Sequence, residues 1–389
     1  MLSNHQQINV PNTLDVEAIE RMLAELWQQS AGHDQAGDDA VFRARVAGLM
    51  VFLHNESLLS DTQQVIGELS SSHPCRALLM AGDRTAAARD IEMYVSAFCG
   101  LQPRSGSRNL CCEEITLTAQ GHFVSELPSA AVPLLVPDLP VFLWWRAQVG
   151  AEDRLFKQLC LAADRVVIDS ADFQDPGSDL VAVAQLFNRR DDETMVLSDL
   201  NWARLTGWRA SLANFYDVPD YREHLDQITD VGISVVAETA GDSAISSQAL
   251  LMVGWLASRL QWKFAGAIET QTPGLGFNFE KNDRPIRITL NEVQRPAMKS
   301  GRLCEIELRS SAAPATFVVS RSEDGLHLKK QTTIGERSYP GRWLLVENRS
   351  AAQLLSREME ILSHDKIYEE AIAVAPEMMG HDAQDRRLN

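Results

Sequence analysis

The sequence lacks any hydrophobic run long enough to cross a membrane as a helix. A transmembrane helix needs about 18–20 consecutive apolar residues, whereas the longest apolar stretch, residues 249–256, soon meets Ser258 and Arg259. The N-terminal stretch MLSNHQQINVPNT is polar and has no apolar core of the kind that marks a secretory signal. We therefore expect a cytoplasmic protein that is not inserted in a membrane.

Cysteine is also scarce, and no cysteine spacing is typical of a metal site or a redox motif. The six cysteines among 389 residues are Cys75, Cys99, Cys111, Cys112, Cys160 and Cys304. So few cysteines do not make a disulfide scaffold, and we expect a reducing compartment, no metal and no cofactor. A redox switch between two cysteines stays open as an alternative, because it needs two Cα atoms within about 7 Å, which a sequence does not establish.

Basic charge is in deficit: 36 Lys and Arg stand against 53 Asp and Glu, so the formal net charge is −17. A general nucleic-acid binder needs a basic face, so this balance argues against nucleic acid as a partner. Residues 280–350 nevertheless hold 13 basic and 9 acidic residues, a charge of +4 that leaves −21 for the remainder. Such a segment favours an acidic partner or an anionic ligand, although an ordinary solvated sheet face would show the same balance.

Enzyme signatures are missing as well. The chain contains no GxxxxGK[ST], HExxH or GxSxG motif, and its nearest glycine fingerprint, GLGFNF at 274–279, has Phe279 in place of the third glycine. Two candidates for anion chemistry remain. His73, before a predicted strand, could act as a general base, and Arg104 and Arg108 in PRSGSR could hold a phosphate or carboxylate. A locally bonded turn histidine and a solvated loop are the alternative interpretations.

Hydrophobic periodicity predicts two domains, with a boundary near 222 or, alternatively, near 165. Residues 1–222 are predicted to form an α/β domain with a mostly parallel (mixed) sheet covered by helices, because helical patterns alternate with short apolar runs. Residues 223–389 are predicted to form an α+β domain with an antiparallel sheet, because period-two strands follow one apolar helix that Ser246 or Ser247 can cap. Ser350 and Gln353 are placed to form a capping box on a final helix.

The stretch PLLVPDLPVFLWWR at 133–146 ends in two adjacent tryptophans. We interpret residues 141–145 as a central strand, with Pro140 at its first position, where a missing N–H group is tolerated. Because side chains alternate across a strand, Trp144 and Trp145 should point to opposite faces of the sheet.

A second aromatic passage, DLNWARLTGWRASLANFYD at 199–217, places Trp202 and Trp208 beside Arg204 and Arg209. Thr206 is predicted to cap a helix over 207–216. Tryptophan and arginine are the residue types that dominate interface hot spots. These four residues, together with Trp144 and Trp145, are therefore predicted partner contacts, although each tryptophan by itself is more typical of a core.

Four motifs, in this order, resemble those of the glucose-6-phosphate dehydrogenase assembly protein (OpcA) family. They are NLCCEEITL (109–117), PLLVPDLPVFLWWR (133–146), ADRVVIDS (163–170) and DLNWARLTGWRASLANFYD (199–217). The motif-bearing part covers roughly residues 75–217. Two positions depart from the pattern: Gly207 stands where the family has proline, and Cys112 stands where it has serine.

The resemblance implies a bacterial, non-catalytic protein that associates with glucose-6-phosphate dehydrogenase, promotes its active oligomer and raises its activity. That enzyme opens the oxidative pentose phosphate pathway and supplies NADPH. The alternative function is a phosphorylated-metabolite-binding enzyme or sensor that uses Arg104, Arg108 and His73. Neither the sequence nor the resemblance tells the oligomeric state of the chain itself.

Overall fold

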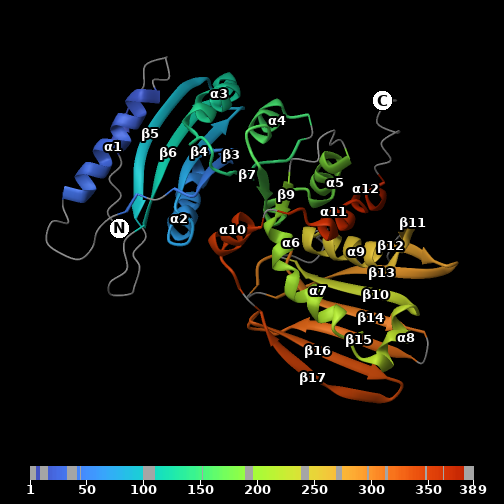
Figure 1. The fold of residues 1–389 in the computed structure, drawn as a ribbon. Coiled ribbons are helices and arrows are strands. Elements are labelled where there is room, and N and C mark those ends of the chain that lie inside the picture. Colours follow the sequence, from blue (N-terminus) through green and yellow to red (C-terminus); the bar gives the residue numbers. More distant parts are fainter. Residues whose placement is uncertain are drawn as a thin grey trace, which may run out of the picture. The chain divides into compact units, whose positions relative to one another are not determined.

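The computed structural model describes residues 6–8, 16–32, 42–43, 45–99, 110–150, 152–188, 196–237, 245–268, 274–295, 298–311, 314–346, 348–361 and 363–380. The chain forms two compact units, each built from separate segments (Figure 1). The first comprises Met1–Asp169, Asp191–Ser198 and Arg349–His364, and the second Ser170–Arg190, Asp199–Asn348 and Asp365–Asn389. The domain boundary near residue 222, or alternatively near 165, stays a prediction.

The first unit contains a mixed sheet whose strands follow the order β1-β5-β6-β4-β3-β7-β8-β9, with β2 beside β6. Strands β6, β4, β3, β7 and β8 pair in parallel, whereas β1 and β5 pair antiparallel, as the sequence predicted. The strands are β1 (Gln6–Ile8), β2 (Phe42–Arg43), β3 (Ala47–Leu53), β4 (Cys75–Asp83), β5 (Arg89–Cys99), β6 (Leu110–Gln120), β7 (Val141–Arg146), β8 (Arg165–Ile168) and β9 (Val196–Asp199).

Helices lie on both faces of this sheet. Glu113 and Glu114 are neighbours on β6 and so point to opposite faces; the pair Arg76–Glu113 contacts Glu20 of α1, whereas Glu114 accepts a hydrogen bond from Gln63 of α2. The first unit contains α1 (Val16–Gly32), α2 (Leu59–Leu69), α3 (Leu127–Ala131), α4 (Arg154–Cys160) and α10 (Ala351–Glu360), with the 3-10 turns η1 (Glu56–Leu58), η2 (Gly121–Glu126) and η3 (Val132–Leu134).

Strand β7 carries the two adjacent tryptophans, and its position explains its composition. It pairs in parallel with β3 on one side and β8 on the other, so the predicted central strand is confirmed. Val141 to Trp145 are all buried, as expected for a strand that is covered on both faces. Pro140 precedes the strand, and its carbonyl accepts the N–H of Gly48 on β3.

The second unit contains a sheet in the order β11-β12-β13-β10-β14-β15-β16-β17. All its pairs are antiparallel except β10–β13. Buried and less buried residues alternate along β13, β14 and β15, so one face packs on the core and the other meets solvent. The strands are β10 (Ile228–Val236), β11 (Lys263–Ile268), β12 (Gly274–Lys281), β13 (Arg284–Val293), β14 (Leu303–Ser310), β15 (Ala315–Arg321), β16 (His327–Ile334) and β17 (Arg337–Leu345).

The helical layer of the second unit centres on α9, which contacts α5, α6, α11 and α12. Ser246 caps α9 as predicted, and the capping box of Ser350 and Gln353 on α10 is confirmed. Thr206 does not cap α7: it is the first residue of that helix, and its hydroxyl donates to the carbonyl of Ala203. The helices are α5 (Pro176–Asn188), α6 (Leu200–Arg204), α7 (Thr206–Ala213), α8 (Arg222–Leu225), α9 (Ser247–Leu260), α11 (Lys366–Ile372) and α12 (Ala375–Met378), with η4 (Ser170–Asp172) and η5 (Pro219–Tyr221).

Candidate functional site

Trp202 on α6 is packed inside the second unit. Its side chain is 4% exposed, and its indole Nε1 donates a hydrogen bond of 2.8 Å to Asp365. The same carboxylate accepts the backbone N–H groups of Ile367 and Tyr368 and so caps α11. Trp202 therefore joins α6 to the first turn of α11.

Arg209 on α7 completes this contact. Its guanidinium lies 3.5 Å from the centre of the Trp202 ring and donates to the backbone carbonyl of Trp202 over 2.8 Å. Burial lowers the pKa of Arg209 to about 10, against the opposing charges of Asp365 and Asp199. The side chain is still charged at neutral pH, so it holds Trp202 by a cation–π contact in a partly dry environment.

Trp208 is the third residue of α7 and is 1% exposed. The guanidinium of Arg321 lies 5.6 Å from its ring centre, and its indole N–H has no hydrogen-bond partner among the described residues. Trp202 and Trp208 thus belong to the core in this chain, whereas Arg204 and Arg209 are half-buried. Contact of these four residues with a partner stays a prediction.

A chain of buried polar groups surrounds the start of α6. The Asp199 carboxylate accepts the N–H of Asn201 over 2.8 Å and the N–H of Ser170 over 3.0 Å. The side-chain amide of Asn201 donates to the Ser170 hydroxyl and accepts a hydrogen bond from the side-chain amide of Gln248 on α9. The side-chain oxygen of Gln248 in turn accepts the backbone N–H of Leu303. These shared hydrogen bonds connect Ser170, α6, α9 and β14 through buried side chains. The sequence analysis did not identify these residues. The signal that could have done so is Asp199, a typical helix-capping residue directly before α6.

The two tryptophans of β7 are each 2% exposed. Trp145 stacks on Phe52 of β3 with ring centres 4.4 Å apart, meets Phe156 of α4 edge-on at 4.8 Å, and donates to the carbonyl of Gln148. Trp144 points to the other face, where the guanidinium of Arg146 lies 4.8 Å from its ring centre. The predicted opposite orientation is confirmed, and a partner contact through either indole stays a prediction.

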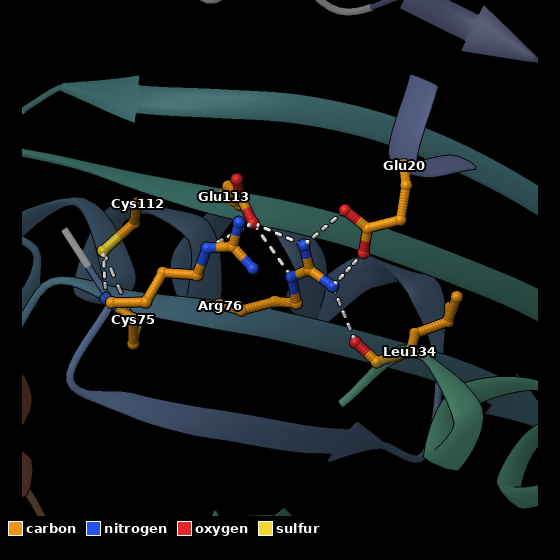
Figure 2. A network of polar contacts seen from close by, with 7 residues as sticks. Glu20, Cys75, Arg76, Cys112, Glu113 and Leu134 are labelled. Atoms are coloured by element: carbon orange, nitrogen blue, oxygen red, sulfur yellow. Dashed lines mark hydrogen bonds and ion pairs between the residues drawn. The ribbon is translucent and has the colours of Figure 1, made fainter. Parts of the chain in front are cut away.

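The most elaborate charged cluster of the first unit, which sequence reasoning also missed, centres on Arg76 (Figure 2). Arg76 on β4 is 2% exposed and bonds to Glu113 of β6 at 2.9 and 2.8 Å, while Glu20 of α1 and the carbonyl of Leu134 take its remaining hydrogens. Arg45 approaches Glu113 at 3.4 Å. Burial acts to lower the pKa of Arg76, but Glu20 and Glu113 outweigh it and raise the pKa above its usual value. The cluster therefore ties α1 and η3 to the sheet.

Glu114 occupies the other face of β6. Its carboxylate accepts hydrogen bonds from Gln63 at 2.7 Å, Thr116 at 3.1 Å and Ser96 at 3.4 Å. Burial raises the pKa of Glu114, and these hydrogen bonds only partly oppose the rise. Because Glu113 and Glu114 face opposite sides of the sheet, they do not act as a pair of acid and base.

Cys75 and Cys112 lie side by side on β4 and β6, next to the Arg76 cluster (Figure 2). Their sulfur atoms are 3.6 Å apart and both thiols are free and fully buried. The hydrogen bond to Cys112 and burial raise the pKa of Cys75. A redox switch between them would first require exposure of this strand pair.

Of the three residues of the metabolite-binding alternative, His73 is the one that lies in the described part of the chain. The Nδ1 atom of His73 lies 2.9 Å from the hydroxyl of Ser356, and its Nε2 lies 3.8 Å from Glu360, so this ring connects to α10. Arg104 and Arg108 lie outside the described residues. Among the residues that are described, no cluster of three or more His, Cys, Asp or Glu side chains is arranged to hold a metal ion, and no helix is long and apolar enough to span a membrane.

The exposed face of the second unit's sheet is hollowed at Gly232 of β10. Arg287 of β13 and Arg309 of β14 line this hollow together with Asp230 and Glu307. The Arg309 guanidinium is already hydrogen-bonded to Glu307. The charges are balanced, so this hollow has no net preference for an anion.

Two family models together match more than half of the chain. Both describe a glucose-6-phosphate dehydrogenase subunit: the model of its N-terminal domain matches residues 67–185, and the model of its C-terminal domain matches residues 195–372. Three cyanobacterial relatives, all provisionally named OxPP cycle protein OpcA, are similar to the chain. The chain belongs to the OpcA family, which confirms the resemblance seen in the sequence.

The relative from Nostoc punctiforme is 30% identical over 329 residues, which cover 82% of this chain and 68% of that protein. The relative from Synechocystis is 28% identical over 319 residues, or 79% of this chain. The chain spans 64% of the length of that protein. Among solved structures, a levoglucosan dehydrogenase in complex with NADH and L-sorbose aligns with 88% of this chain and 98% of its own, at a TM-score of 0.46 and 8% identity. A likeness of that degree carries no argument about function.

Proposed function

We propose that the chain is a non-catalytic assembly factor and allosteric activator of glucose-6-phosphate dehydrogenase in the oxidative pentose phosphate pathway. The observation that carries the proposal is the match of both halves of the chain, in order, to the two domains of the glucose-6-phosphate dehydrogenase subunit family. The three OpcA relatives support the same pathway, since each is named as an OxPP cycle protein.

An activator of this kind works by linkage. It raises the activity of the dehydrogenase only if it binds the active conformation or oligomer more tightly than the inactive one. A tenfold shift in that equilibrium requires about 1.4 kcal/mol of differential affinity. An interface of ordinary size, about 1,600 Å² in total, can supply such a difference.

The structure supports this role by giving the chain rigid elements on which to carry a binding surface. The indole ring of Trp202 on α6 is fixed by Asp365 and Arg209. We keep the passage 199–217 as a proposed contact region. With its indoles buried, the parts of the passage that reach solvent are the exposed side of α7 and the half-buried Arg204 and Arg209.

The direct test is a titration of purified chain into a fixed concentration of its cognate glucose-6-phosphate dehydrogenase, with the initial rate and the particle mass measured together. We expect a saturable rise in rate that parallels a change in the mass of the dehydrogenase. If neither the rate nor the mass changes, the proposal is wrong.

A second measurement distinguishes the proposed activator from the alternative, a metabolite-binding enzyme or sensor. Thermal unfolding of the chain alone is followed with glucose 6-phosphate, NADP or 6-phosphogluconate added singly. An activator that works through protein contacts should show no rise in midpoint. A clear rise with one ligand would favour a metabolite-binding enzyme or sensor, because a ligand that binds the folded state stabilises it.

A further inference from the structure

Exposed hydrophobic side chains gather on one edge of the second unit's sheet. Ten large hydrophobic residues are exposed in the described part of the chain, and five of them fall in the short segment from 326 to 345. Trp343 is 57% exposed and Leu345 is 72% exposed. Single exposed hydrophobic residues need no explanation, but a group of them marks an interaction surface. The five are Leu326, Tyr339, Trp343, Leu344 and Leu345.

The strand register shows which of these residues share a face. In the β16–β17 pair, Lys329 stands opposite Trp343 and His327 stands opposite Leu345. These four side chains therefore project from the same face of the sheet. The next residue of β16, Leu328, points the other way and is 2% exposed. Trp343 and Leu345 thus lie on the face that the core does not cover.

Trp343 is held in place although it is exposed. The Lys329 ammonium lies 5.8 Å from the centre of the indole ring, and the His327 ring meets the indole edge-on at 6.2 Å and 89°. An exposed tryptophan that is already ordered loses little conformational entropy on binding. Tryptophan is also one of the residue types that dominate interface hot spots.

The charged group that this face carries beside the indole is Lys329. Lys330 and Arg342 stand opposite each other one position further along, so they point to the other face, and the carboxylate of Asp324 lies 3.8 Å from His327. The Lys329 ammonium next to an exposed indole favours a partner surface that offers a carboxylate beside an apolar contact.

Strand β17 has features that oppose pairing of its free edge with another strand. Pro340 in the middle of β17 has no N–H to donate, and the register of the β16–β17 pair shifts between Lys330 and Thr332. A Cβ atom on Gly341 would lie 2.4 Å from the carbonyl oxygen of Lys330, so the bulge requires glycine there. Prolines and bulges on an edge strand oppose pairing with another strand.

We infer that Trp343 and Leu345, flanked by Lys329 and His327, form a surface through which this chain binds glucose-6-phosphate dehydrogenase, at an acidic patch of the enzyme and in addition to the proposed contact region 199–217. The inference rests on the proposed function and adds the site to it. We call these four residues the β17 surface.

The test measures the Kd of full-length variants for the purified cognate dehydrogenase. Trp343→Ala should weaken binding about 30-fold, the effect of removing a hot-spot residue. Leu345→Asp should weaken it at least tenfold, because it places a carboxylate against the partner's own. Lys329→Glu should weaken binding most at low salt, since steering by exposed charges is screened as salt rises.

Matched controls come from the same chain. Leu161→Asp changes a leucine that is 90% exposed in the first unit, and Lys263→Glu changes an exposed lysine on β11, the opposite edge of the same sheet. Both should bind as the wild type does. Equal binding by all variants and the wild type would overturn the β17 surface but leave the proposed function intact. A wild type that does not bind the dehydrogenase would overturn both. If the wild type alone is a dimer that Trp343→Ala dissociates, the surface holds a second copy and the inference is wrong.

Discussion

Two regions of the second unit each place a basic side chain against a tryptophan ring, but the rings differ in how far they are exposed. In the passage 199–217, Trp202 and Trp208 are 4% and 1% exposed, with Arg209 and Arg321 against their rings. On β17, Trp343 is 57% exposed, with Lys329 over its ring. A basic side chain against an indole ring is thus part of the core in the first region and part of the exposed surface in the second. Exposure distinguishes them, and composition does not.

The largest effect should come from breaking the buried region. Trp208→Ala should lower the free energy of unfolding by about 3–5 kcal/mol, because it removes a fully buried ring and leaves a cavity. Urea unfolding measures it. Trp208→Phe is the control: it keeps an aromatic ring, and the lost indole N–H has no partner among the described residues, so the change should be much smaller. An equal loss in both variants would mean that a hydrogen bond, not packing, holds this position.

The second prediction concerns the buried ion pair of the first unit. It tests whether this pair contributes to the free energy of unfolding, as packing of the tryptophans does in the second unit. Glu113→Gln should destabilise the chain by about 2–3 kcal/mol, because Arg76 is 2% exposed and would keep only Glu20 as a charged partner in that cluster. The control is Arg84→Gln, which breaks an ion pair with Asp153 in which the arginine is half exposed. That change should stay within about 0.5 kcal/mol. Similar losses in both variants would contradict a special role for burial.

A smaller effect concerns pH. Because burial raises the pKa of Glu114, the folded chain binds this proton more tightly than the unfolded chain does, whose glutamate pKa is about 4.3. The contribution of Glu114 to stability therefore falls as pH rises through its folded pKa and is regained on acidification. The stability of the wild type relative to Glu114→Gln should be higher at about pH 5 than at about pH 8. A difference that does not change with pH would show that the pKa is not raised.

The smallest change in stability belongs to the exposed region. Trp343→Ala should alter the free energy of unfolding by no more than about 0.5 kcal/mol, as is usual for surface positions. Thermal or urea unfolding beside Trp208→Ala gives the contrast directly. A loss of about 3 kcal/mol or more, roughly that of a buried ring, would show that Trp343 supports the fold and would remove the distinction between the two regions.

Local patterns predicted local structure well. The run of apolar residues at 141–145 identified β7 as a central strand, and the spacing of Ser350 and Gln353 identified a capping box. Thr206 was misplaced because the N-terminal residue of a helix and its cap differ by one position, which the side chain alone does not reveal. Periodicity also indicated an antiparallel sheet in the second half of the chain.

Contacts between distant segments could not be predicted in this way. Arg76 meets Glu20, 56 residues away in sequence, and Asn201 meets Gln248, 47 residues away, and neither pairing leaves a signal in the local pattern. Trp343 was not singled out in the sequence, because its exposure depends on the place of β17 at the edge of the sheet, which local periodicity does not give. That position in the sheet decides how far its indole is covered.

The most direct measurement is the activation of the cognate dehydrogenase by the wild type, Trp343→Ala, and Trp208→Phe, each confirmed as folded. We expect Trp208→Phe to activate at the wild-type concentration, whereas Trp343→Ala should need about 30-fold more protein for half of the effect. Activation that is unchanged in Trp343→Ala but lost in folded Trp208→Phe would contradict the assignment of the β17 surface as a binding site. The dehydrogenase would then depend on the region around Trp208, whose ring is buried in this structure.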